Sequence, residues 1–232
     1  MNTTYRKMAG AAGLVMVVLW IAFVALLGNA PEMNAAPSAI AGYFSSSQAA
    51  LQWSIFLFLI STPFFLFFAS GLLKILRESD AQWGENFEFG AAAGIIGTAA
   101  LIVVQSAANG LLTSGLLGTA NAAQVSTIYA FAQLLHPASG VFLVLWYACV
   151  AIPGIRHKIL PAAICWLAVV VGVVEVIYAT ATVSVGGIAP QVNFDMVEGG
   201  VSIIWIIAVC VWLLAGRAEK VAPVSAAAPA RA

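Results

Sequence analysis

The sequence predicts an all-α polytopic membrane protein, a bundle of six transmembrane helices with both termini on the cytoplasmic side. The 232-residue chain is 62% hydrophobic and 8% charged, and its mean hydropathy is +1.02. Soluble domains carry about 25% charged residues, so the nine basic and nine acidic residues are too few to coat a soluble domain of this size. The net charge of zero argues against a nucleic-acid partner.

Six apolar runs define the expected spans. A span needs about 20 apolar residues to cross a hydrocarbon core of about 30 Å. The runs are continuous rather than alternating, which favours helices over β-strands. The expected spans are 8–28, 49–73, 90–112, 125–152, 159–183 and 196–216, forming a single domain over residues 1–220. The Ala/Pro-rich tail, 221–232, has no apolar run to bury and is predicted to be disordered.

The basic residues set the predicted orientation. Six alternating spans place all nine on one side, which the positive-inside rule makes cytoplasmic. They are Arg6, Lys7, Lys74, Arg77, Arg156, Lys158, Arg217, Lys220 and Arg231. We therefore expect a multi-pass protein of the plasma or inner membrane. One alternative remains open: the first run could be a signal peptide cleaved near Gly28-Asn29-Ala30, leaving five spans, although it is longer than such regions usually are.

Polar residues share a helical face with small residues in several spans. Small residues mark helix–helix contacts in membranes, so these faces are expected to point into the bundle. Span 90–112 carries Gly90, Gly94, Thr98, Gln105 and Asn109; span 125–152 carries Tyr129, Gln133, His136, Gly140 and Tyr147; span 159–183 carries Ala168, Gly172, Glu175, Ala179 and Thr182, with Tyr178 beside them. The last span opens with Asp195 and Glu198.

These polar groups also share a depth. At a rise of about 1.5 Å per residue, they fall in the outer half of the bilayer, with His136 slightly deeper. The sequence therefore predicts one polar pocket that opens outward, with Asp195 and Glu198 at its mouth. Its predicted binding residues are Glu175, His136, Gln133, Gln105, Asn109, Tyr178, Tyr129, Asp195 and Glu198.

Glu175 is the only formal charge well inside an expected span. An isolated carboxylate at this depth would take up a proton, and an intramembrane ionisable residue is a functional hypothesis by default. Two interpretations stay open: a titrating group, or a protonated side chain that hydrogen-bonds neighbouring helices. A contact between Glu175 and His136 would make a proton relay.

No cofactor is expected. His136 and His157 are the only histidines, and the helical rise between them separates their depths by about 30 Å, too far to ligate one haem. The three cysteines lack C-x-x-C spacing, so no metal site is expected. The four lysines lie at the cytoplasmic edge, which argues against retinal attachment. Ser139 has no G-x-S-x-G elbow, so a membrane-embedded enzyme is the third-ranked hypothesis.

Two stretches carry a family resemblance. The short basic start Tyr5-Arg6-Lys7-Met8-Ala9-Gly10 runs straight into the first span, and a basic turn precedes Leu160-Pro161 at the fifth. In this layout the chain resembles uncharacterised six-span integral membrane proteins of bacteria. The resemblance implies a bacterial integral membrane protein, and no functional residue is carried over from it.

The leading functional hypothesis is a membrane protein whose outward-facing polar pocket binds a small molecule or ion, a proton-linked transporter being one form, with Glu175 as the titrating group. The alternative is a structural or accessory membrane subunit whose polar residues only specify helix packing, with a partner surface such as the Phe-rich stretch 64–68. The expected partners are the lipid bilayer, a small ligand and a membrane protein.

Overall fold

The computed structural model describes residues 2–79, 84–114, 121–184 and 191–215, and all regular secondary structure within these ranges is α-helical. The helices are α1 (Thr3–Leu27), α2 (Pro37–Ser46), α3 (Gln48–Ser79), α4 (Gly84–Thr113), α5 (Ala122–His157), α6 (Ala162–Ser184) and α7 (Gln191–Ala215). All of them except α2 are long and apolar enough to cross a membrane. The prediction of an all-α, six-span membrane bundle is therefore confirmed.

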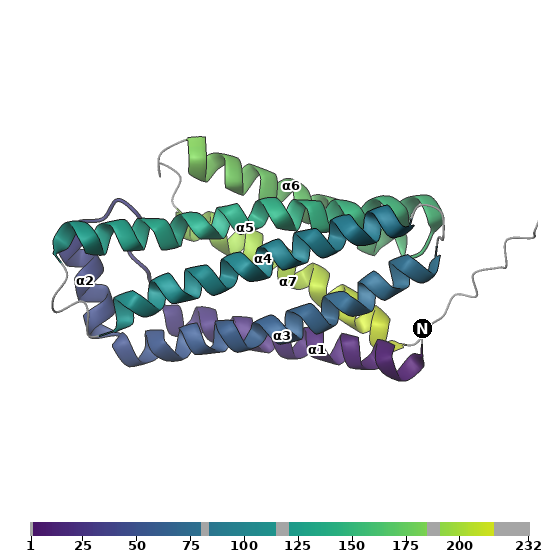
Figure 1. The fold of residues 1–232 in the computed structure, drawn as a ribbon, viewed down its shortest axis with the longest axis horizontal. Helices are drawn as coiled ribbons and strands as arrows, with labels where there is room; N and C mark the ends of the chain where they lie inside the picture. The colour runs from purple at the N-terminus through teal and green to yellow at the C-terminus, as the bar shows by residue number, and fades with distance from the viewer. Residues whose placement is uncertain (1, 80–83, 115–120, 185–190, 216–232) are drawn as a thin grey trace, which may run out of the picture.

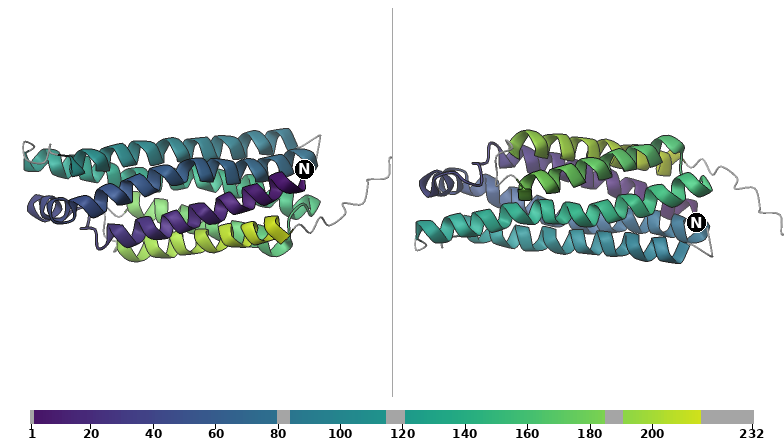
Figure 2. Two further views of the ribbon diagram at one scale, coloured as in Figure 1. Left: turned by 90° about the horizontal axis from the view of Figure 1, so that it is seen from below. Right: turned by 90° about the horizontal axis from the view of Figure 1, so that it is seen from above.

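The long helices lie side by side and run roughly along the length of the bundle (Figures 1 and 2). Contacts join α1 to α3, α3 to α4, α4 to α5, α5 to α6, α6 to α7, and α7 back to α1. The bundle is thus a closed ring in chain order, as short connections between antiparallel neighbours favour. Helix α7 crosses the bundle obliquely (Figure 1).

Small residues bring α4 and α5 close together. A Cβ atom on Gly94 would lie 2.7 Å from the carbonyl oxygen of Phe142 and 2.9 Å from the amide nitrogen of Trp146. A Cβ atom on Gly90 would lie 2.7 Å from Sγ of Cys149. The Gly90-x-x-x-Gly94 pair is therefore a packing motif, because only glycine leaves room for the neighbouring helix.

An aromatic group at Trp205 fills the centre of the ring. The Trp205 ring packs edge-on against Phe68 of α3, Trp146 and Tyr147 of α5, with centroid distances of 6.3, 6.4 and 5.1 Å. Its Nε1 donates a hydrogen bond of 3.1 Å to the carbonyl of Ile164 in α6. We call Phe68, Trp146, Tyr147 and Trp205 the aromatic core; it ties four helices together.

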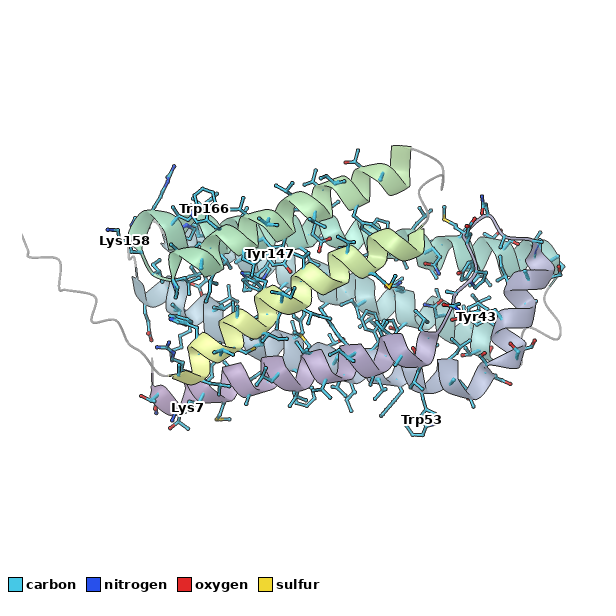
Figure 3. All side chains as sticks on the ribbon, turned by 180° about the vertical axis from the view of Figure 1, so that it is seen from behind. Lys7, Tyr43, Trp53, Tyr147, Lys158 and Trp166 are labelled. Carbon is cyan, nitrogen blue, oxygen red and sulfur yellow. The ribbon has the colours of Figure 1, made fainter. Side chains whose placement is uncertain are left out.

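The basic residues within the described ranges gather at one end of the bundle, which we call the basic end; Lys7 and Lys158 mark it in Figure 3. Arg6 there donates to the carbonyl of Trp212 at 2.9 Å and lies 4.2 Å from the centre of that ring. The full set is Arg6, Lys7, Lys74, Arg77, Arg156 and Lys158. This grouping is what six alternating spans require; the cytoplasmic orientation stays a prediction. Arg217, Lys220, Arg231 and the tail 221–232 lie outside the described residues.

The opposite end carries helix α2, which lies between the expected spans 8–28 and 49–73. Pro37 occupies the first turn of α2, a favoured position for proline. Ile40 and Phe44, one turn apart, are both buried. Helix α2 is also tied to the preceding chain, because the Tyr43 hydroxyl donates to the carbonyl of Leu27 at 2.6 Å. The apolar cluster below it, which we call the α2-end cluster, consists of Ile40, Phe44, Leu51, Leu112, Val125 and Tyr129.

Three helices are longer than a bilayer requires. Helices α3, α4 and α5 have 32, 30 and 36 residues, and at about 1.5 Å per residue they run for about 45–54 Å. Trp53 and Trp166 are 62% and 60% exposed and lie toward opposite ends of the bundle (Figure 3). Exposed tryptophans are typical of membrane–water interfaces, so the α2-end cluster extends beyond the Trp53 interface.

Candidate functional site

Two acidic side chains face each other inside the ring, one from α6 and one from α7. Glu175 is 1% exposed and Glu198 is 6% exposed. Their carboxyl groups lie close enough for a side-chain hydrogen bond between them. An ionised carboxylate can only accept a hydrogen bond, so this bond requires that one of the two groups carries a proton. Glu175 and Glu198, which we call the carboxyl pair, are therefore placed to share one proton inside the bundle.

His136 of α5 contacts the carboxyl pair and is partly exposed, so it lies at the edge of this polar cluster. Its Nε2 lies 3.4 Å from Oε2 of Glu198. Its ring also packs edge-on against Tyr178 of α6, with centroids 5.5 Å apart. The His136 side chain is 36% exposed whereas that of Glu198 is 8% exposed, so the imidazole is the most accessible polar group of the cluster.

Two hydroxyl groups extend the cluster toward the basic end. Ser202 donates from Oγ to Oε1 of Glu198 at 3.4 Å, and the Tyr147 hydroxyl donates to Oγ of Ser202 at 3.5 Å. Tyr147, labelled within the bundle in Figure 3, packs on Trp205. The hydrogen-bonded chain from Glu198 therefore ends at the aromatic core, which is the apolar boundary of the cluster on the side of the basic end.

Gly140 of α5 makes room for the Glu175 carboxyl group. A Cβ atom at residue 140 would lie 2.6 Å from Oε2 of Glu175 and 3.7 Å from its Cδ. The other carboxyl oxygen, Oε1, is buried with no hydrogen-bond partner among the described residues. Buried polar atoms are normally paired, so Oε1 is an acceptor available to a donor or cation that enters the cluster.

The backbone around His136 is held by short polar contacts. Pro137 removes one amide donor from α5. Ser139 donates from Oγ to the carbonyl of His136 at 2.7 Å, and Thr98 of α4 donates from Oγ1 to the carbonyl of Ser139 at 3.3 Å. These bonds link α4 to the turn of α5 that presents His136 and Gly140 to the carboxyl pair.

The structure brings together four of the residues that the sequence singled out: Glu175, Glu198, His136 and Tyr178. Glu198 was expected at the mouth of a pocket, and it instead lies buried against Glu175. A relay between Glu175 and His136, which the sequence made conditional on their contact, has Glu198 available as its link, because His136 contacts Glu198.

The other predicted site residues lie elsewhere. Gln105, Asn109 and Gln133 are half-buried, and within the described ranges no hydrogen bond joins them to the carboxyl pair. Tyr129 belongs to the α2-end cluster, where its hydroxyl donates to the carbonyl of Pro31 at 2.5 Å. Asp195 falls in α7, and its side chain is outside the described residues.

Sequence reasoning underweighted Ser202 and Tyr147. The available signal was the spacing of Glu198, Ser202 and Trp205 on α7, which puts all three on one helical face. A face that ends in a buried tryptophan points inward, so Glu198 is carried inward with it. Among the described residues no group of three His, Cys, Asp or Glu side chains is placed to hold a metal ion.

Comparison with protein-family models, with curated proteins and with solved structures found no match for this chain. The fold and the site therefore define the class by themselves: a multi-pass helical membrane protein that encloses a buried pair of carboxyl groups.

Proposed function

We propose that this protein is a proton-linked transporter or ion-binding protein of the membrane, with the carboxyl pair as its proton site. The observation that carries the proposal is the close approach of two buried carboxyl groups, Glu175 and Glu198, in the interior of the bundle. Ionisable groups at such a depth are costly and are typical of proton and ion pathways.

The electrostatics of the pair support a coupled site. Two carboxylates in contact repel strongly, so they do not both ionise without a compensating cation. Release of the shared proton therefore favours entry of a cation, and uptake of a proton favours its departure. The unpartnered Oε1 of Glu175 and the His136 imidazole beside Glu198 are the groups that respond to this change.

The geometry also favours one direction of access. His136 is the most accessible polar group of the cluster, and imidazole exchanges protons near neutral pH. The aromatic core closes the other side, because Trp146 and Trp205 are each 1% exposed. Protons are thus expected to reach the pair past His136, from the half of the bundle that leads to α2.

The test is the charge displaced when protons bind. The purified protein is reconstituted in liposomes on a solid-supported membrane sensor and exposed to pH jumps, and to sodium or potassium jumps at constant pH. The wild type is expected to give a capacitive current on the pH jump. Glu175→Gln keeps the size and hydrogen-bonding capacity of the side chain but cannot titrate, so the current should be lost.

Two further variants make the test specific. Glu32→Gln removes an exposed carboxyl group outside the ring and should leave the current unchanged. Glu175→Ala should lose the current and also lower the unfolding midpoint. If Glu175→Gln is monodisperse and still gives the wild-type current and pH dependence, its charge has no role, and a structural subunit explains the residue better.

A further inference from the structure

A second polar feature lies at the basic end, where α3 and α4 line an open cavity of about 630 Å³. This volume is within the range of small-ligand sites, about 300–1,000 Å³. The cavity is lined by Ser70, Leu73, Lys74, Arg77, Glu78 and Glu88. None of these residues takes part in the carboxyl pair or its hydrogen-bonded chain.

The cavity combines two cations with two carboxylates. Arg77 Nε lies 3.8 Å from Oε2 of Glu88, and the two side chains are 72% and 28% exposed. An ion pair that long and that exposed contributes little stability, so both partners can turn to a ligand. Lys74 Nζ lies 5.3 Å from the ring of Tyr5, whose hydroxyl hydrogen-bonds Ser70 at 2.8 Å. Tyr5 thus holds the Lys74 ammonium beside the cavity.

The position of the cavity points to a lipid rather than to a soluble ligand. Lys74 and Arg77 belong to the end of the bundle where the basic residues gather, and basic pockets between transmembrane helices at this level bind phospholipid headgroups. Leu73 lines the cavity. Phe89, which directly follows Glu88, is 78% exposed and offers an apolar surface to an acyl chain.

The charge balance selects the kind of headgroup. An anionic headgroup would be attracted by Lys74 and Arg77 but repelled by the carboxylates of Glu78 and Glu88. A headgroup with a phosphate and an ammonium matches both pairs, because each of its charges meets an opposite charge with N–H donors or oxygen acceptors.

We propose that the cavity between α3 and α4 binds the headgroup of a zwitterionic phospholipid, phosphatidylethanolamine, with Lys74 and Arg77 on the phosphate and Glu88 on the ammonium. The trimethylated ammonium of phosphatidylcholine has no N–H donor for Glu88, so it should bind more weakly. This site is independent of the carboxyl pair, and its test does not require transport.

The experiment is native mass spectrometry of the delipidated full-length protein titrated with phosphatidylethanolamine, phosphatidylcholine or phosphatidylglycerol. Lys74→Gln should weaken binding of phosphatidylethanolamine by about three- to tenfold, the scale of one charge-assisted contact at an exposed site. Glu88→Gln should weaken phosphatidylethanolamine similarly while leaving phosphatidylglycerol unchanged or tighter. Lys7→Gln removes an exposed charge at the same end without touching the cavity and is the matched control.

Three results would overturn the proposal. Equal binding of all three lipids, with no response to Lys74→Gln, indicates surrounding bilayer lipid only. A preference for phosphatidylglycerol that Glu88→Gln increases indicates an anionic-lipid site. Competition by water-soluble glycerophosphoethanolamine at the same concentration as the lipid indicates a soluble ligand. A thermal midpoint close to the wild type shows that each variant is folded.

Discussion

Gly140 gives the sharpest test of the geometry around the carboxyl pair. In Gly140→Ala the new methyl group would lie 2.6 Å from Oε2 of Glu175, whereas ordinary contact begins at 3.4 Å. The carboxyl group must therefore retreat by about 0.8 Å, the difference between these two distances. Glu175 is 1% exposed and faces Glu198, so this movement disturbs the carboxyl pair. Overpacking of this kind typically costs about 1–3 kcal/mol.

Gly172→Ala is the matched control. Its added Cβ atom would lie 3.6 Å from Cβ of Tyr147, an ordinary contact. Both substitutions gain a similar helix propensity, up to about 1 kcal/mol, so the difference between them isolates the contact with Glu175. We expect Gly140→Ala to be less stable than Gly172→Ala by about 1–3 kcal/mol, measured by SDS titration in mixed micelles with tryptophan fluorescence.

A second-site change checks the cause. Glu175→Asp shortens the side chain by one methylene, so it should relieve the clash made by the alanine at residue 140. The double variant is expected to be more stable than the sum of the two single effects by at least about 0.5 kcal/mol. Additive effects, or a Gly140→Ala stability within about 0.5 kcal/mol of Gly172→Ala, would refute the placement of the Glu175 carboxyl against α5.

Three further predictions concern the bundle and its α2 end. Gly94→Ala should destabilise by about 3 kcal/mol, because its Cβ atom meets α5 backbone, whereas Gly110→Ala meets nothing within 4 Å and should be near neutral; equal SDS midpoints would contradict this. Trp205→Phe loses the hydrogen bond to Ile164 and should cost about 1–3 kcal/mol in the same titration; an unchanged midpoint would count against the aromatic core. Burial raises the pKa of Tyr43 from 10.0 to about 12. The folded protein therefore holds the phenol proton more tightly than the unfolded chain does. The stability that this proton contributes is complete below about pH 10 and is lost as the pH rises toward 12. Tyr43→Phe should remove that part of the loss of stability at alkaline pH, which circular dichroism measures between these two pH values. An alkaline unfolding profile identical to that of the wild type would refute the prediction.

The topology was predictable because it depends on long-range averages. Span length, the absence of charges and the grouping of basic residues each involve many positions, so single errors do not change the number of spans. The packing role of Gly90 and Gly94 was also visible, since small residues at four-residue spacing allow close approach. Helix α2 was missed because its signal is short: Pro37 followed by Ile40 and Phe44 in an otherwise polar loop.

The site was only partly predictable, for a geometric reason. Residue spacing places Glu175 and His136 on inward faces, but it does not say which helices are neighbours. In the closed ring α6 lies between α5 and α7, so Glu198 on α7 meets Glu175, while Gln105 on α4 does not. Glu198 was assigned to the mouth of the pocket because it stands near the start of a span. Glu198 is nevertheless only 6% exposed.

The central claim is that Glu175 and Glu198 share a proton through a direct hydrogen bond. Infrared spectroscopy of the protein in lipid at neutral pH measures this most directly, through the carbonyl-stretch band of a protonated carboxyl group. We predict such a band in the wild type, shifted or removed by Glu175→Gln and also by Glu198→Gln, and unaffected by Glu32→Gln. The absence of a protonated carboxyl band, or a band that responds to one substitution of the pair and ignores the other, would contradict the account.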